Sequence, residues 1–131
     1  GLQVLFDYSE ENDTKCLGIL PGRVRLFPRN MPSESGVPYK IPHMGWNEVR
    51  FDRRHPVFEH IPAGSEFYFV HSYYPDPEDP AHPCGATAYG ITFCSAVAWR
   101  NLAAVQFHPE KSGPAGLKIL ENFCRWDGRS S

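Results

Sequence analysis

The sequence lacks a long apolar stretch. Nowhere in its 131 residues do about 18 consecutive apolar residues occur, the length that a membrane-spanning helix needs. The first residues also lack the charged-then-apolar order of a secretory signal peptide. The formal net charge at pH 7 is −2, whereas a nucleic-acid-binding domain normally carries clustered Lys and Arg. We therefore predict a cytoplasmic protein with no membrane or nucleic-acid partner.

Cysteine is scarce and irregularly spaced. The chain has no Cys-x-x-Cys pair and no spacing typical of a disulfide framework or a structural zinc site. His82-Pro83-Cys84 offers half of a metal site, but no second pair of ligands accompanies it. No cysteine lies in a Gly-x-Cys-x-Gly turn, which would expose a nucleophilic thiol. We predict reduced thiols, no metal and no cofactor; the cysteines are Cys16, Cys84, Cys94 and Cys124.

What is present is typical of one globular domain. Hydrophobic residues make up 41% of the chain and charged residues 21%, both in the ordinary range. Apolar residues at helical spacing predict a helix over residues 1–11. Alternating or β-branched stretches predict strands over residues 23–27, 48–51, 66–74, 87–89, 91–98 and 103–107, with exposed loops at 28–42 and 75–83.

A closing helix is expected after the last strand. Ser112 is a suitable N-cap, Pro114 suits a first helical turn, and Gly128 is expected to end the helix. The apolar spacing predicts a buried stripe on this helix formed by Ile119, Leu120, Phe123 and Trp126.

Two titratable residues follow the last predicted strand. His108 and Glu110 flank Pro109, whose fixed φ and effect on the preceding residue favour an extended tripeptide. Residues i and i+2 of an extended chain face the same way, so the Glu110 carboxylate is expected to orient the His108 imidazole. Such a pair is the base and orienting group of a nucleophilic triad.

Three stretches resemble one enzyme family. Residues 103–113, AAVQFHPEKSG, resemble the C-terminal catalytic motif of class I glutamine amidotransferases, in which His and Glu complete a Cys-His-Glu triad. Residues 42–47, PHMGWN, and 68–73, YFVHSY, resemble the glutaminase subunit of imidazole glycerol phosphate synthase. The resemblance covers nearly the whole chain. It implies acyl transfer from L-glutamine and delivery of ammonia to a cyclase subunit, within a heterodimer that serves histidine biosynthesis.

The resemblance also implies a fold and a register. The expected fold is the α/β, flavodoxin-like fold of class I glutamine amidotransferases, with residues 1–131 as its C-terminal part: a mixed sheet and a closing helix without the parallel N-terminal half. The family pattern Gly-x-Cys-Leu-Gly-x-Gln aligns with Gly1-Leu2-Gln3 so that the nucleophile precedes Gly1 by two residues. A chain truncated just after the nucleophile is expected to be inactive alone.

Residue roles follow from the same resemblance. It implies catalytic roles for His108 and Glu110. It implies substrate-binding roles for Gln3, Glu11, His71, Ser72 and Tyr73. It implies contact with the cyclase subunit for His43, Met44, Gly45, Trp46, Asn47, Tyr68 and Lys111.

Two alternatives stay open at this point. Another class I amidotransferase, such as the glutaminase of anthranilate or guanylate synthesis, would share His-Pro-Glu but should lack the PHMGWN stretch at residues 42–47. A non-catalytic remnant or binding subunit would have lost its nucleophile altogether.

Overall fold

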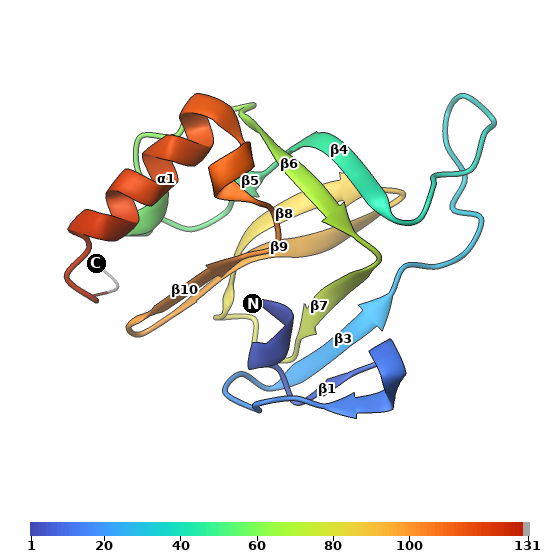
Figure 1. The fold of residues 1–131 in the computed structure, drawn as a ribbon, viewed down its shortest axis with the longest axis horizontal. Helices are drawn as coiled ribbons and strands as arrows, with labels where there is room; N and C mark the ends of the chain where they lie inside the picture. Colours follow the sequence, from blue (N-terminus) through green and yellow to red (C-terminus); the bar gives the residue numbers. More distant parts are fainter. Residues whose placement is uncertain (130–131) are drawn as a thin grey trace.

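Strands dominate the architecture that a computed structural model describes for residues 1–129 (Figure 1). The first sheet has the order β2-β1-β3-β7. It is mixed, because β1 runs parallel to β3 while its other pairs are antiparallel. Its strands are β1 (Tyr8–Ser9), β2 (Thr14–Lys15), β3 (Gly22–Leu26) and β7 (Tyr73–Pro77).

The second sheet is antiparallel and has the order β10-β9-β8-β5. Its long hairpin turns at Gly90, which has φ +76° and where an added Cβ would lie 2.7 Å from the Met31 sulfur. Glycine is therefore required at this turn. The strands are β5 (Arg50–Phe51), β8 (Pro83–Tyr89), β9 (Ile91–Trp99) and β10 (Leu102–Val105).

The third sheet is the antiparallel pair of β4 (His43–Glu48) and β6 (Glu66–His71). The inward face of β6 carries Phe67 and Phe69, both fully buried, while Met44 and Trp46 of β4 are exposed on the other face. This alternation follows from the two-residue period of a strand. The pair thus has one core face and one apolar outer face.

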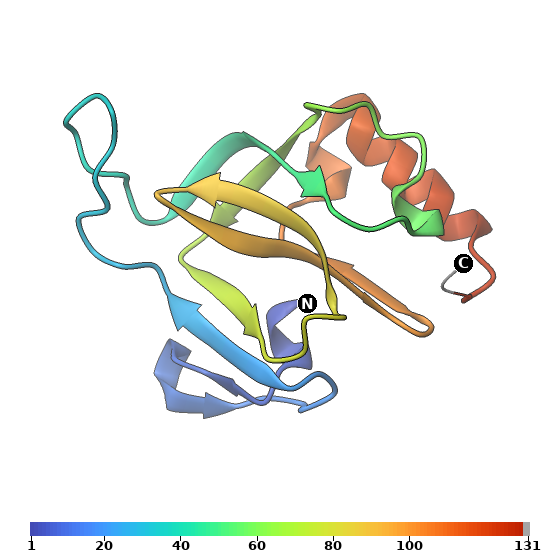
Figure 2. The same ribbon diagram turned by 180° about the vertical axis from the view of Figure 1, so that it is seen from behind.

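The helix α1 (Gly113–Arg125) lies across one end of the strands, beside the turn that precedes it (Figures 1 and 2). Buried phenylalanines from several strands form the main core below it, with Ile119 as the buried side chain of the helix. Short 3-10 turns complete the fold: η1 (Gln3–Leu5), η2 (Glu11–Asp13), η3 (Pro56–Phe58) and η4 (Pro109–Lys111).

Two helix predictions need correction. Residues 1–11 form no α-helix: only η1 is helical before β1, and the Asp7 carboxylate accepts a hydrogen bond from the Gly22 amide at 3.1 Å, which draws this segment to β3. The closing helix is present but ends at Arg125 rather than at Gly128. Its predicted stripe is only partly buried, since Ile119 is 3% exposed while Phe123 is 53% exposed.

The predicted strands are mostly present with shifted bounds. The stretch 66–74 is divided at Ser72 into β6 and β7, which belong to different sheets. The predicted loop 75–83 begins later, because β7 extends through Pro77. Within residues 1–129, no helix has the length and apolar character needed to cross a membrane.

Candidate active site

His108 lies between the end of β10 and the turn η4 that precedes α1, and hydrogen bonds hold its backbone there. The His108 amide donates to the Tyr68 carbonyl of β6 at 3.0 Å. The buried Ser112 hydroxyl donates to the His108 carbonyl and accepts from the Tyr68 amide at 2.9 Å. The sequence predicted that the Ser112 side chain caps α1, but it makes no capping hydrogen bond. It binds the backbone of His108 to β6 instead.

His108 and Glu110 lie together. His108 is extended, with φ −99° and ψ 97°, but Pro109 starts the 3-10 turn η4, so the tripeptide is not extended throughout. The turn brings Glu110 Oε2 to 3.3 Å from His108 Nδ1. A carboxylate on Nδ1 orients the ring and leaves Nε2 as the nitrogen that exchanges protons with a reacting group. The pairing was predicted correctly, although through a different backbone conformation.

A pocket of about 410 Å³ opens beside His108. All five residues predicted to bind substrate line it, and Glu110 lies behind His108 rather than in the lining. The lining is formed by Gly1, Leu2, Gln3, Val4, Glu11, Val70, His71, Ser72, Tyr73, Val105, Gln106 and His108. The fold thus gathers the N-terminal turn, the β6–β7 junction and the end of β10 around one cavity.

Gln3 connects two other residues of the pocket lining. Its side-chain amide donates to the Tyr73 carbonyl at 3.0 Å and to Gln106 Oε1 at 3.1 Å. Gln106 was not singled out from the sequence. Its position two residues before His108 was a usable signal, because strand alternation directs such residues to the same side.

The predicted partner surface divides into two sets. Met44 and Trp46 are 62% and 54% exposed, and Lys111 is also exposed. Tyr68 lies edge-on to Trp46 on the same outer face of the β4–β6 pair. The outward residues thus match the prediction of an exposed patch.

The other three residues of the predicted partner surface, His43, Gly45 and Asn47, alternate with Met44 and Trp46 along β4. His43 is only 2% exposed, whereas Gly45 and Asn47 are partly exposed, and a Cβ at Gly45 would meet no other atom within 4 Å. A surface position is corrected for His43 alone, because the two-residue period of a strand turns its ring into the core. The predicted contact of Gly45 and Asn47 with a partner stays a prediction.

Two buried histidines, His43 and His71, are in contact with each other, and His71 lines the pocket. Burial, and then the neighbouring His71, lowers the pKa of His43 to about 4. Burial, with a smaller contribution from His108, lowers the pKa of His71 to about 4, although the hydrogen bond to the Tyr73 carbonyl raises it. Both rings are therefore neutral near pH 7.

No thiol faces His108 among the described residues, since no cysteine lines the 410 Å³ pocket. Burial raises the pKa of Cys94 to about 12 and also raises that of Cys84, so both are poor nucleophiles. The part of the chain that the structure describes also contains no group of three or more side chains placed to hold a metal ion.

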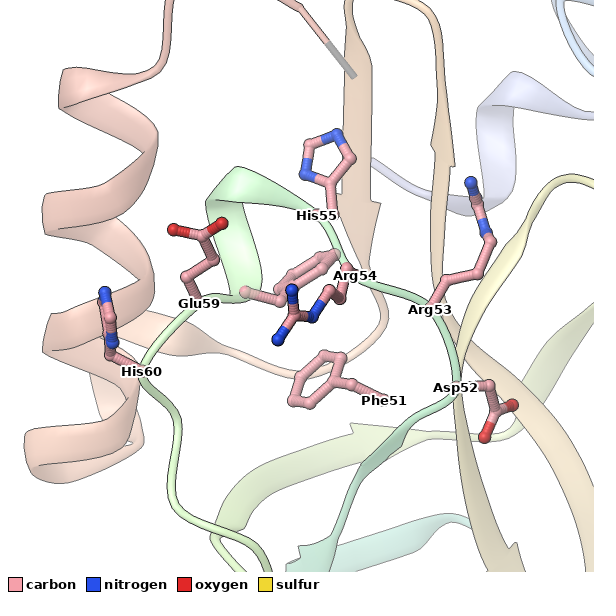
Figure 3. Close-up of a pocket in the computed structure, with 8 residues that line it drawn as sticks. Phe51, Asp52, Arg53, Arg54, His55, Glu59 and His60 are labelled. Atoms are coloured by element: carbon pink, nitrogen blue, oxygen red, sulfur yellow. The ribbon is translucent and has the colours of Figure 1, made fainter. Parts of the chain in front are cut away.

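A second pocket, of about 540 Å³, is lined by residues between 51 and 60, from β5 to just after η3, and has mixed charge (Figure 3). Arg53 points away from Arg54 in this view, and its guanidinium donates to the carbonyls of His82, Pro83 and Ala98. Its cation therefore has a structural role. The candidate active site is the smaller pocket at His108.

Comparison with known proteins agrees with this geometry. Residues 1–126 match the family described as Glutamine amidotransferase class-I. The chain belongs to this family. The class I fold expected from the sequence is thereby confirmed, and the observed mixed sheet and closing helix are consistent with it.

Individual relatives indicate which members of this family the chain resembles. The imidazole glycerol phosphate synthase subunit HisH of Methylococcus capsulatus is 53% identical over 133 residues, covering 100% of this chain and 61% of the relative. The protein of that name in Nitrosospira multiformis is 54% identical over 127 residues, covering 96% of this chain and 59% of the relative. The chain therefore spans about three fifths of the length of these relatives.

A solved structure shares the fold. The crystal structure of a candidate GMP synthase component from Thermoplasma acidophilum superimposes with a TM-score of 0.55 at 20% identity, covering 65% of this chain and 44% of that one. At this identity the similarity concerns the fold alone.

Proposed function

We propose that these residues form the C-terminal part of the glutaminase subunit of imidazole glycerol phosphate synthase, which hydrolyses L-glutamine and supplies ammonia to the cyclase subunit in histidine biosynthesis. The observation that carries the proposal is the His108–Glu110 pair, 3.3 Å apart, with His108 lining the same pocket as Gln3 and His71. The relatives named HisH support the choice of this synthase. We assign the activity to the cytoplasm as part of the same proposal.

The proposed chemistry is covalent acyl transfer. A cysteine thiolate attacks the glutamine carboxamide, His108 protonates the departing ammonia, and the same ring then takes a proton from the water that hydrolyses the thioester. Glu110 keeps the ring oriented and stabilises its charged form. Since no cysteine lines this pocket, we propose that the nucleophile comes from a segment outside these 131 residues.

The proposed partner surface is the outer face of the β4–β6 pair. Met44, Trp46 and Val70 are exposed there, and Tyr68 packs beside Trp46. Large apolar side chains that lie together on a surface are typical of interface centres. We propose that the cyclase subunit docks on this face, with Lys111 at its border.

The test is reconstitution. The upstream part of the Methylococcus capsulatus relative, joined before Gly1 and combined with the cyclase subunit of that organism, should release ammonia from glutamine. His108→Ala in this protein should abolish the release. Absence of release from a folded reconstituted protein would favour the non-catalytic alternative. Release that does not respond to the cyclase subunit would favour another class I amidotransferase.

A further inference from the structure

Five groups on four strands form one continuous line of hydrogen bonds that ends at the pocket. The Asn47 side-chain amide donates to the Ala88 carbonyl at 2.9 Å and lies 3.2 Å from His43 Nε2. His43 Nδ1 lies 2.9 Å from His71 Nε2. His71 Nδ1 lies 2.8 Å from the Tyr73 carbonyl. The line joins β8, β4, β6 and β7, which belong to three different sheets.

The direction of every hydrogen bond in this line is fixed by its ends. The Tyr73 carbonyl can only accept, so His71 Nδ1 carries the proton, and the neutral ring has a bare Nε2. His43 must then donate from Nδ1, which leaves its Nε2 to accept from Asn47. The orientation of the Asn47 amide is set independently, because its Oδ1 accepts from the Glu48 amide at 2.8 Å. A single arrangement of protons therefore satisfies the whole line.

Packing holds the two rings in place. His43 stacks against Tyr89 with centroids 4.0 Å apart and against Phe69 at 4.7 Å. Phe27 packs against His71 at 5.3 Å. Buried polar groups whose hydrogen bonds are all made fix one conformation, whereas a partly satisfied network is costly. The same hydrogen bonds connect β4 to the Tyr73 carbonyl through the two rings.

That carbonyl belongs to the candidate active site. It accepts from the Gln3 side chain at 3.0 Å as well as from His71, and Gln3 also donates to Gln106. Ser72 and Tyr73 both line the pocket proposed for glutamine. Two donors converge on this one peptide, so its orientation depends on both.

We propose that Asn47, His43 and His71 act as positioning residues that hold the Tyr73 peptide of the glutamine pocket and connect it to β4, whose outer face is exposed. The expected effect on glutamine binding rests on the proposed function. It predicts that breaking the line weakens glutamine binding and leaves the chemical step nearly intact, because none of the three side chains reaches His108 by a hydrogen bond in the described structure.

The first test reads the proton arrangement directly. Nitrogen NMR of the reconstituted subunit should show both His43 and His71 protonated on Nδ1, with a coupling across the hydrogen bond between His43 Nδ1 and His71 Nε2. A ring of His71 protonated on Nε2 would overturn the proposal. This result does not depend on activity, so it stands apart from success or failure of the glutaminase assignment.

The second test separates KM from kcat. His43→Phe keeps the ring stacking but removes both hydrogen bonds, and we expect the KM for glutamine to rise about tenfold with kcat within about twofold. His82→Phe is the matched control, since His82 is 3% exposed, packs on Trp99 and lies outside the line. A KM unchanged in His43→Phe, or raised equally in His82→Phe, would overturn the proposal.

A second variant guards against misfolding. Asn47→Leu at a partly exposed position breaks the same line at its other end, and we expect KM to rise about threefold. In both variants the carbonyl ¹³C shift of Tyr73 should change, and in His82→Phe it should not. If the reconstituted protein releases no ammonia, the proposed function fails, while this shift still decides whether the line holds the Tyr73 peptide.

Discussion

Ser112 is the residue on which the geometry of the candidate triad depends most. Its hydroxyl bonds the His108 carbonyl and the Tyr68 amide at once and is 2% exposed. Ser112→Ala leaves both backbone groups without that partner, so we expect a loss of about 1–3 kcal/mol in the free energy of unfolding, measured by urea denaturation. Ser35→Ala, in the exposed loop, should change it by less than about 0.5 kcal/mol. Equal effects of the two variants would contradict this role.

The buried histidines predict a loss of stability in mild acid. Burial lowers the pKa of His43 and of His71 from 6.5 to about 4. Between these values the unfolded chain binds more protons than the folded one, so stability is complete above about pH 6.5 and falls as the pH drops towards 4. Each ring contributes up to about 1.4 kcal/mol per pH unit.

Urea midpoints measured between about pH 7.5 and pH 5 check this slope, before most carboxylates titrate. His43→Phe should make the slope shallower. Met44→Ala, on the opposite face of β4, should leave it as it is. Burial also lowers the pKa of His55, so part of the slope should persist in every variant. An unchanged slope in His43→Phe would rule out His43 as a source of the acid sensitivity.

At the scale of elements, α1 approaches the catalytic turn through a glycine. A Cβ at Gly116 would lie 2.0 Å from the Pro109 carbonyl oxygen and 2.7 Å from Ser112 Cβ. Alanine normally favours a helix over glycine by about 1 kcal/mol. Here we expect Gly116→Ala to destabilise by about 1–3 kcal/mol, because the helix must move away from η4.

Thermal unfolding measures this effect, and Leu117→Ala is its control. Leu117 is 57% exposed on the same helix, so its truncation should shift stability by about 0.5 kcal/mol or less. The imidazole NMR signals of His108 should move in Gly116→Ala, since η4 carries Glu110. A Gly116→Ala protein more stable than the unsubstituted one would contradict the close approach.

The outer face of the β4–β6 pair carries a prediction about coupling. Trp46→Ala in the reconstituted subunit should weaken the dependence of glutamine hydrolysis on ammonia use, while leaving the fold intact, because the side chain is 54% exposed. Phe123→Ala on α1 removes an aromatic ring of similar exposure, 53%, away from that face and serves as control. Unchanged coupling in a normally assembled complex would count against docking at β4–β6.

Local pattern predicted some elements well and missed others for physical reasons. The strands that contain Phe69 and Val97 were predicted from runs of β-branched and aromatic residues. Both side chains are fully buried, so packing in the core favours the same strands. The helix over residues 1–11 was wrong because its apolar residues also suit a turn that buries Leu2 and Phe6 against β3, an outcome set by distant partners. Local spacing cannot distinguish the two.

The candidate site shows the same division. The proximity of His108 and Glu110 was predictable from their spacing. The resemblance of the motifs to the family predicted substrate-binding roles for Gln3 and Ser72, and both residues line the pocket. The inward direction of His43 was missed because a motif carried over as a run of residues ignores strand alternation.

At the scale of the whole molecule, residues 1–129 place an orienting carboxylate beside a base, with no thiol lining the same pocket. We therefore expect the purified chain to release no more ammonia from glutamine than its His108→Ala variant. Removing one triad member typically leaves only residual catalysis from binding and transition-state stabilisation. An assay of ammonia release from glutamine, with the reconstituted subunit as reference, measures this directly.

Release at a rate comparable to the reconstituted protein, lost in His108→Ala, would mean that a nucleophile lies within these residues. Cys94 and Cys84 are poor candidates, because burial raises the pKa of both thiols. Cys124 is exposed on α1 and Cys16 lies after β2, and neither lines the pocket. Because every cysteine is thus separated from His108 by position, burial or both, activity of the chain alone would require a rearrangement of the fold around the His108–Glu110 pair.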